Sequence, residues 1–238
     1  MREKNMHGGV IWAKSRRLKW ILLTTAAVYV TCFYGWNVGV PVLSFNGETS
    51  LWIRPTNVLP AALGIFSVVM VTSPMSWIDR ASSKTVMRFD MVAYVVVGAL
   101  VAGAVLLPIG VLSILPRRFV PNIDDMDSTG SAAFVEVISG YRFSVYVIPA
   151  IFFLSCSIVA VAALGKLFGL IFASVIYILN IAVTTIPSIS AYSPLFLNGR
   201  SDIGVIRAWA IFTGFMYICA IVFCWLWKNF GLIIEIRK

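Results

Sequence analysis

The chain has 238 residues, of which 60% are hydrophobic and only 12% are charged, and its formal net charge is +9. The charged fraction is about half of that in a soluble domain, so the composition excludes an ordinary soluble protein. The positive charge does not indicate nucleic-acid binding, because it is concentrated in the segments between alternate apolar runs, which is typical of membrane proteins.

The chain begins with a polar, basic segment, residues 1–19. This segment predicts either a short helix in the lipid headgroup layer, with Trp12 and Trp20 as interfacial anchors, or a positive tail that only fixes orientation. The apolar run that follows is too long for a signal-peptide core, and no small-x-small cleavage site follows Trp36. We therefore expect it to remain in the protein as a signal anchor.

Six long apolar runs without charged residues fill most of the chain, and they lack the alternating pattern of barrel strands. A helix needs about 17–25 apolar residues to cross a membrane. The sequence therefore predicts an all-α, multi-pass membrane protein with one transmembrane domain over residues 1–238 and six transmembrane helices. The runs extend approximately over Trp20–Trp36, Leu59–Pro74, Met91–Leu115, Phe143–Leu164, Leu167–Pro187 and Ala208–Trp227.

The first two connecting segments differ in character. The loop after the first run contains several glycines and prolines, so we expect it to be irregular, with apolar patches at Val40–Leu43 and Leu51–Ile53 that could reach the membrane interface. In the segment 75–90, Ser76 and Asp79 have capping-box spacing, and neither Gly nor Pro follows before the next run. This pattern predicts a short helix, from Ser76 to Arg88, along the cytoplasmic membrane surface.

The later connections are a long loop and a tight turn. The loop 116–142 is expected outside the cytoplasm, and its aspartates at 124, 125 and 127 do not match a calcium-loop spacing, so a solvated surface is favoured. Only Gly165 and Lys166 separate the fourth and fifth runs, which predicts a helical hairpin with Lys166 reaching lipid phosphate. Gly165 and Gly169 have the G-x-x-x-G spacing of a helix-packing motif, but they straddle the predicted turn. We therefore interpret both as turn glycines.

Charge placement predicts the orientation. If every run crosses once from a cytoplasmic N-terminus, the inner segments contain thirteen basic and four acidic residues, and the outer segments contain six of each. All of the net charge then lies on one side, as the positive-inside rule requires. The prediction is a protein of the cell membrane with both termini in the cytoplasm and with affinity for anionic lipid.

Catalytic motifs are missing from the sequence. The only histidine, His7, lies in the N-terminal segment, there is no phosphate-binding loop, and no charged residue falls in the middle of a run. We expect neither an enzyme nor a cofactor or metal site, and the four cysteines should be buried apolar residues. A transporter powered by its own ion gradient is also disfavoured, since such proteins need an intramembrane charge.

Polar residues within the runs are scattered. Most Thr and Asn side chains in membrane helices bond to backbone or to a neighbouring helix, and Asn180 is the strongest candidate for an interhelical contact. Pro108 and Pro149 lie inside runs and are expected to kink those helices.

Six spans with both ends inside, a basic segment before the first span and a helical inner loop after the second resemble the ABC-2 type permease subunits. The matching stretch extends from Pro74 to Lys84 and is followed by Arg88, and the loop around Ser193-Pro194-Leu195 is also similar. The resemblance implies that the inner loop docks on a separate ATPase and that a homodimer or a second permease subunit completes the pathway. The docking residues would be Trp77, Ile78, Asp79, Arg80 and Lys84, although many family members have Glu where this chain has Asp79.

A second function class uses the same features. A membrane scaffold, immunity or assembly subunit that transports nothing needs the same apolar helices and the same absence of catalytic groups. A membrane enzyme that acts on lipid would require histidine or paired carboxylates near the surface, and only the aspartates of the loop 116–142 approach that requirement. The alternatives of permease subunit and scaffold therefore remain open at the level of sequence.

Overall fold

The computed structural model describes residues 18–35, 40–42, 51–53, 55–72, 84–114, 143–184, 186, 193–196 and 203–236. Each of the six predicted apolar runs forms a helix, as predicted. The helices are α2 (Leu18–Tyr34), α3 (Pro55–Val71), α5 (Lys84–Ile114), α7 (Phe143–Leu164), α8 (Lys166–Thr184) and α10 (Ile203–Ile236), with one 3₁₀ turn, η2 (Pro194–Phe196).

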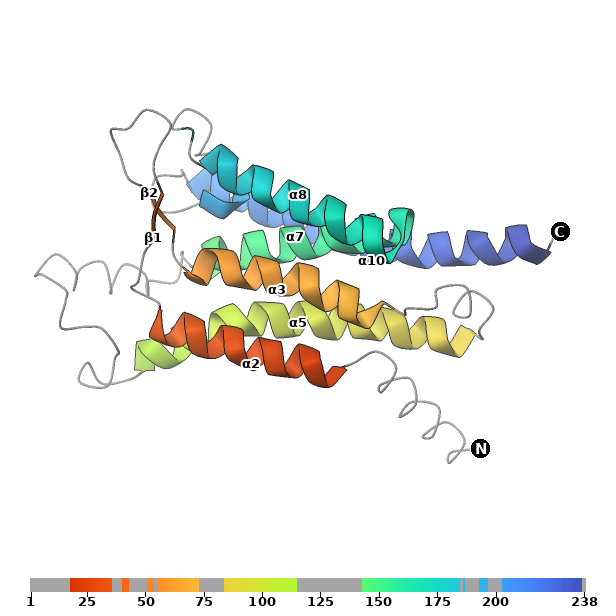
Figure 1. Ribbon diagram of the computed structural model, residues 1–238, viewed down its shortest axis with the longest axis horizontal. Coiled ribbons are helices and arrows are strands. Elements are labelled where there is room, and N and C mark those ends of the chain that lie inside the picture. Colours follow the sequence, from red (N-terminus) through yellow and green to blue (C-terminus); the bar gives the residue numbers. More distant parts are fainter. Residues whose placement is uncertain are drawn as a thin grey trace, which may run out of the picture.

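These helices form an antiparallel bundle in which each runs opposite to the one before it (Figure 1). The first residues of α2, α5 and α8 therefore lie at the same end of the bundle as the last residues of α3, α7 and α10. Helix α10 extends furthest beyond that end. We call this end of the bundle, where α2, α5 and α8 begin, the α2-start end.

Helix α7 occupies the centre of the bundle and packs against α3, α8 and α10. Phe153, Leu154 and Ile158 on α7 are completely buried. Over the apolar stretch of α7, 56% is buried inside the protein, compared with 17% for α8 and 17% for α10. The outer two helices thus present most of their surface to the surroundings of the bundle.

Small residues allow α3 to approach α7 closely. A Cβ atom added to Gly64 would lie 3.2 Å from both the Ala150 carbonyl oxygen and the Leu154 Cβ, tighter than most real contacts.

The buried serine hydroxyls of α7 are satisfied within the helix. The hydroxyls of Ser155 and Ser157 donate to carbonyls of their own helix, each at 2.7 Å. These polar groups therefore need no water inside the apolar bundle.

The turn between α7 and α8 confirms one glycine prediction and corrects the other. Gly165 has a positive φ of 83°, which is the conformation that favours glycine in a tight turn. Gly169 lies in α8, where an added Cβ would come 2.5 Å from the Val161 Cα and 2.7 Å from the Ala160 oxygen. Gly169 is therefore a helix-packing glycine, because the turn is so short that α8 is already against α7 one turn later.

The loop after α2 contains a small antiparallel pair of strands, β1 (Val40–Val42) and β2 (Leu51–Ile53). Val40 pairs with Ile53 and Val42 pairs with Leu51. The expectation of an irregular loop is wrong for these residues, because the two apolar patches satisfy part of their backbone groups by pairing with each other.

Four helices are long and apolar enough to cross a membrane, over Phe89–Leu112, Val145–Leu164, Lys166–Thr184 and Ile203–Trp227. Two shorter apolar helices, Leu18–Tyr34 and Val58–Val71, lie beside them. The protein is thus a helical membrane protein. Pro108 and Pro149 lie within helices as the sequence indicates, and so does Pro60 of α3.

Candidate functional site

A cluster of polar side chains joins the helices near the α2-start end of the bundle. Thr72 follows the last residue of α3, and Lys166 is the first residue of α8. Lys166 Nζ donates a hydrogen bond to the Thr72 carbonyl oxygen at 3.1 Å. A cation at this position stabilises the carbonyl end of a helix, where the helix dipole is negative.

Thr72 itself extends the end of α3. Its backbone amide and its hydroxyl both donate to the Val68 carbonyl, at 2.9 and 2.7 Å. The last turn of α3 is therefore held in a helical form and bound to α8 through Lys166. The sequence predicted that Lys166 reaches lipid phosphate, whereas the structure shows that its amine also bonds to protein.

Asp90 is the functional candidate that the sequence analysis missed. It was counted with the inner loop, but it lies within α5 and only 4% of its surface is exposed. A buried carboxylate is costly unless other groups stabilise it, and Asp90 does have interactions in the structure. A signal existed in the sequence: Asp90 is in helical register with Tyr94, Val97 and Val101, which are all buried.

Tyr94 connects α5 to two further helices. Its side chain is buried near Thr72, which follows α3, near Cys224 of α10 and near Asp90 of its own helix. The hydroxyl of Tyr217, on α10, donates to the Tyr94 carbonyl oxygen at 2.8 Å. A Cβ added to Gly98 would clash with the Tyr217 ring, so this glycine makes room for the contact.

We call these residues, Thr72, Asp90, Tyr94, Lys166, Tyr217 and Cys224, the inter-helix cluster. It includes residues from the end of α3, the beginning of α5, the beginning of α8 and the middle of α10. Among the described residues, no three His, Cys, Asp or Glu side chains gather where they could hold a metal ion. The arrangement offers no catalytic constellation, and its hydrogen bonds link α8 to the end of α3 and α10 to α5.

The predicted ATPase-docking residues lie next to this cluster in the chain. Trp77, Ile78, Asp79 and Arg80 fall outside the described residues. Lys84 is the first residue of α5, so the last part of the predicted surface helix, residues 84–88, is continuous with that helix. The remainder of the surface helix stays a prediction.

Asn180 and the threonines of the apolar runs mostly bond within their own helices. Asn180 Nδ2 donates to the Ile176 carbonyl at 3.2 Å, while Thr25 and Thr31 donate to carbonyls four residues earlier. The Asn180 side-chain oxygen accepts from the Ser193 hydroxyl at 3.4 Å, just before η2. An unforeseen interhelical bond runs from the Tyr177 hydroxyl of α8 to the Val58 carbonyl of α3, at 2.9 Å.

Comparison with family models, with curated proteins and with solved structures gives no match to this chain. The resemblance to ABC-2 permeases therefore remains a prediction from the residues and the order of the helices.

Proposed function

We propose that the chain is the membrane-spanning permease subunit of an ABC-type exporter in the cell membrane, energised by a separate ATPase chain. The observation that supports this proposal best is the Lys166 bond to Thr72, together with the burial of Asp90 and Tyr94 near the beginning of α5. These contacts anchor both ends of the segment that would dock on the ATPase.

The proposed topology has six spans with both termini in the cytoplasm. Helices α2 and α3 have 17 residues each, about 25 Å at 1.5 Å per residue, so they would cross where the bilayer is slightly thinned. The alternating directions of the helices and the excess of basic residues in the inner segments support this arrangement. The inter-helix cluster then lies at the cytoplasmic side.

The proposed mechanism follows from the anchored segment. The docking segment connects Thr72 to Lys84, and any displacement of it acts on the end of α3 and the beginning of α5. The inter-helix cluster passes that displacement to α8 and α10, and α3 also packs along α7. A coupling device needs such contiguous contacts between an effector site and the elements that move.

A permease of this size forms half of a pathway, so the proposal includes a homodimer or a second permease subunit. The exposed apolar surfaces of α8 and α10 are large enough to offer a subunit contact, with Phe168, Phe172 and Phe215 each more than half exposed. Lipid covers whatever part of these surfaces the partner leaves open.

The first experiment is purification in mild detergent followed by identification of stoichiometric partners. A nucleotide-binding subunit supports the permease, whereas a large assembly without an ATPase supports the scaffold alternative.

The second experiment is a triple variant, Trp77→Ala with Asp79→Lys and Arg80→Glu, in the complex. Loss of buried contacts of about 1.4 kcal/mol or more should reduce coupled transport at least about tenfold, while ATP hydrolysis continues.

The control variant reverses one basic and one acidic residue in the loop 116–142, Arg117→Glu with Asp124→Lys, and leaves the net charge unchanged in the same way. It should transport normally, since that loop is predicted on the other side of the membrane. Normal coupling in the triple variant would refute the assignment of the docking segment.

A further inference from the structure

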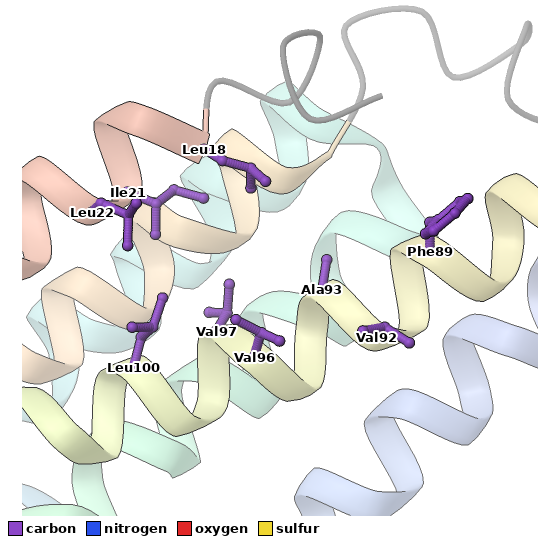
Figure 2. A pocket seen from close by; sticks show the side chains of 9 residues that line it. All are labelled: Leu18, Ile21, Leu22, Phe89, Val92, Ala93, Val96, Val97 and Leu100. Atoms are coloured by element: carbon purple, nitrogen blue, oxygen red, sulfur yellow. The ribbon is translucent and has the colours of Figure 1, made fainter. Parts of the chain in front are cut away.

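The apolar groove between α2 and α5 is a surface that lipid alone can cover. Figure 2 shows Leu18, Ile21 and Leu22 of α2, which line it together with residues of α5 between Phe89 and Leu100. The cavity has a volume of about 260 Å³, and its lining residues are all apolar. Its α5 residues belong to the apolar span that begins at Phe89, so lipid tails reach them and no protein partner is required.

Helix α10 differs because it continues past its membrane span. The span ends at Trp227, whereas the helix ends at Ile236, nine residues later. Nine residues add about 13 Å at 1.5 Å per residue, and the headgroup layer is about 5–8 Å thick on each side of a bilayer. Helix α10 extends furthest beyond the α2-start end (Figure 1), so in a bilayer its last turn projects past the headgroups.

One side of α10 carries exposed residues at alternating intervals of three and four. We call these positions the α10 seam, and within the span they are Ala208, Ile211, Phe215, Ile218, Val222 and Trp225. An average repeat of 3.5 residues is the spacing of the contact stripe of a coiled coil. Thr213, Ala220 and Cys224 on the opposite side of the helix are buried, so the seam faces away from the bundle.

The α10 seam continues in the part of the helix beyond the span. Asn229, Leu232 and Ile236 extend the same alternation of four and three residues. Lipid tails do not reach past the span, so a surface that only lipid covers does not need this spacing there. Asn229 is the one amide among the seam positions, and a single Asn in such a seam fixes the register and the number of helices in a coiled coil.

We propose that a second copy of this chain packs against α10 along the α10 seam, with the two α10 helices parallel. Both copies insert in the membrane with the same orientation, so a twofold axis along the membrane normal brings identical seam positions together at the same depth. From Ala208 to Ile236 the contact is about 42 Å long and about 12 Å wide. It covers about 500 Å² on each copy and about 1,000 Å² in total, the size that a specific interface requires.

The contact locates the homodimer that the proposed function includes, and to that extent it rests on that function. Helix α8 ends with its span at Thr184, and its exposed surface is left to lipid. Because the contact joins two folded chains, dilution separates them without unfolding either. Substitutions in the seam therefore act on association and not on the stability of the single chain.

The test is the fraction of dimers among labelled single molecules in phosphatidylcholine bilayers, counted by photobleaching over a range of protein densities. We expect dimers at high density and monomers at low density. Ile218→Trp should weaken association about tenfold or more, because an oversized side chain in a packed seam forces the helices apart. Ile178→Trp on α8 is the matched control and should leave association unchanged, since Ile178 is 62% exposed and Ile218 is 63% exposed.

Crosslinking tests the parallel register. Leu232→Cys should form a disulfide between two copies in membranes under mild oxidation. Ile234→Cys, two residues later and about 200° around the helix, should not. The unaltered protein gives the background from the four native cysteines.

Monomers at every density, or equal crosslinking of Leu232→Cys and Ile234→Cys, would overturn the proposal. Dimers that persist in Ile218→Trp but are lost in Ile178→Trp, or in Val96→Trp at the groove of Figure 2, would assign the contact to another face and equally overturn it. Neither assay measures transport or ATP hydrolysis, so their failure leaves the ATPase-docking proposal to its own experiments.

Discussion

Helices α7 and α10 are similarly apolar but lie in different surroundings. Their membrane spans have mean hydropathies of 2.5 and 2.0, yet 56% of the apolar stretch of α7 is buried and only 17% of that of α10. In water such a difference in burial would leave a clear pattern in the sequence, since one face would be polar. In a membrane both surroundings are apolar, so hydrophobicity does not distinguish the core from the lipid-facing surface.

Small residues on the buried surface of α7 mark where its neighbours approach it. The buried surface of α7 includes Ala150, Ser155, Ser157 and Ala160, which permit close approach of α3 and α8. The exposed surface of α10 includes Phe212, Phe215, Trp225 and Trp227. Membrane helices associate through packing of small residues, whereas large side chains contact lipid without cost.

The largest effect is expected from removing a core ring on α7. Phe153 is 1% exposed and makes an edge contact with Tyr177 of α8, with ring centres 5.1 Å apart. Phe153→Ala should lower the free energy of unfolding by about 3 kcal/mol, the lower end of the usual range for this substitution, because transfer to hydrocarbon contributes little in a bilayer.

The matched variant is Phe215→Ala on α10, where the side chain is 65% exposed. It should change the free energy of unfolding by less than about 0.5 kcal/mol. Unfolding in mixed micelles with increasing sodium dodecyl sulfate measures both. If the two variants lose the same stability, the exposed surface of α10 is buried against another subunit in the preparation.

Glycine positions give the second comparison. An added Cβ at Gly169 of α8 would press on the backbone of α7, whereas at Gly214 of α10 nothing lies within 4 Å of it. Gly169→Ala should therefore destabilise the protein by about 1–3 kcal/mol. Gly214→Ala should be neutral or slightly stabilising, because alanine favours the helix by up to about 1 kcal/mol.

The same unfolding measurement reads both glycine variants. Tolerance of Gly169→Ala would mean that α8 can move away from α7 in the membrane. The assignment of Gly169 as a helix-packing glycine would then be wrong.

The sequence predicted the helices and the hairpin turn because long apolar runs and a glycine flanked by them have few alternative structures. It did not reveal which helix is central, since α7 and α10 satisfy the same hydropathy rule. It also placed Asp90 in a loop, because a charged residue at the edge of an apolar run usually marks its end. Here α5 begins six residues earlier, at Lys84, and carries Asp90 into the bundle.

The paired strands β1 and β2 show a further limit of the sequence reading. Each strand has three residues, too few for a pattern of alternation to be visible. Only the register of the two segments, with Pro41 opposite Trp52, relates them to each other. Pairing between two such short segments is not encoded in their residue spacing.

The smallest effect is expected at the bond between α10 and α5. Tyr217→Phe removes the hydroxyl that donates to the Tyr94 carbonyl at 2.8 Å and leaves the ring in place. Interhelical hydrogen bonds in membrane proteins are worth about 0.6 kcal/mol on average, so the loss of stability should be of that size. Tyr177→Phe, which removes the 2.9 Å bond from α8 to Val58, should cost about the same.

The two variants differ in position: Tyr217 belongs to the inter-helix cluster and Tyr177 does not. If the cluster couples the docking segment to α10, Tyr217→Phe should reduce transport per ATP hydrolysed, whereas Tyr177→Phe should leave that ratio unchanged. Equal ratios in the two variants would remove α10 from the proposed coupling route while leaving the Lys166 contact with α3 in place.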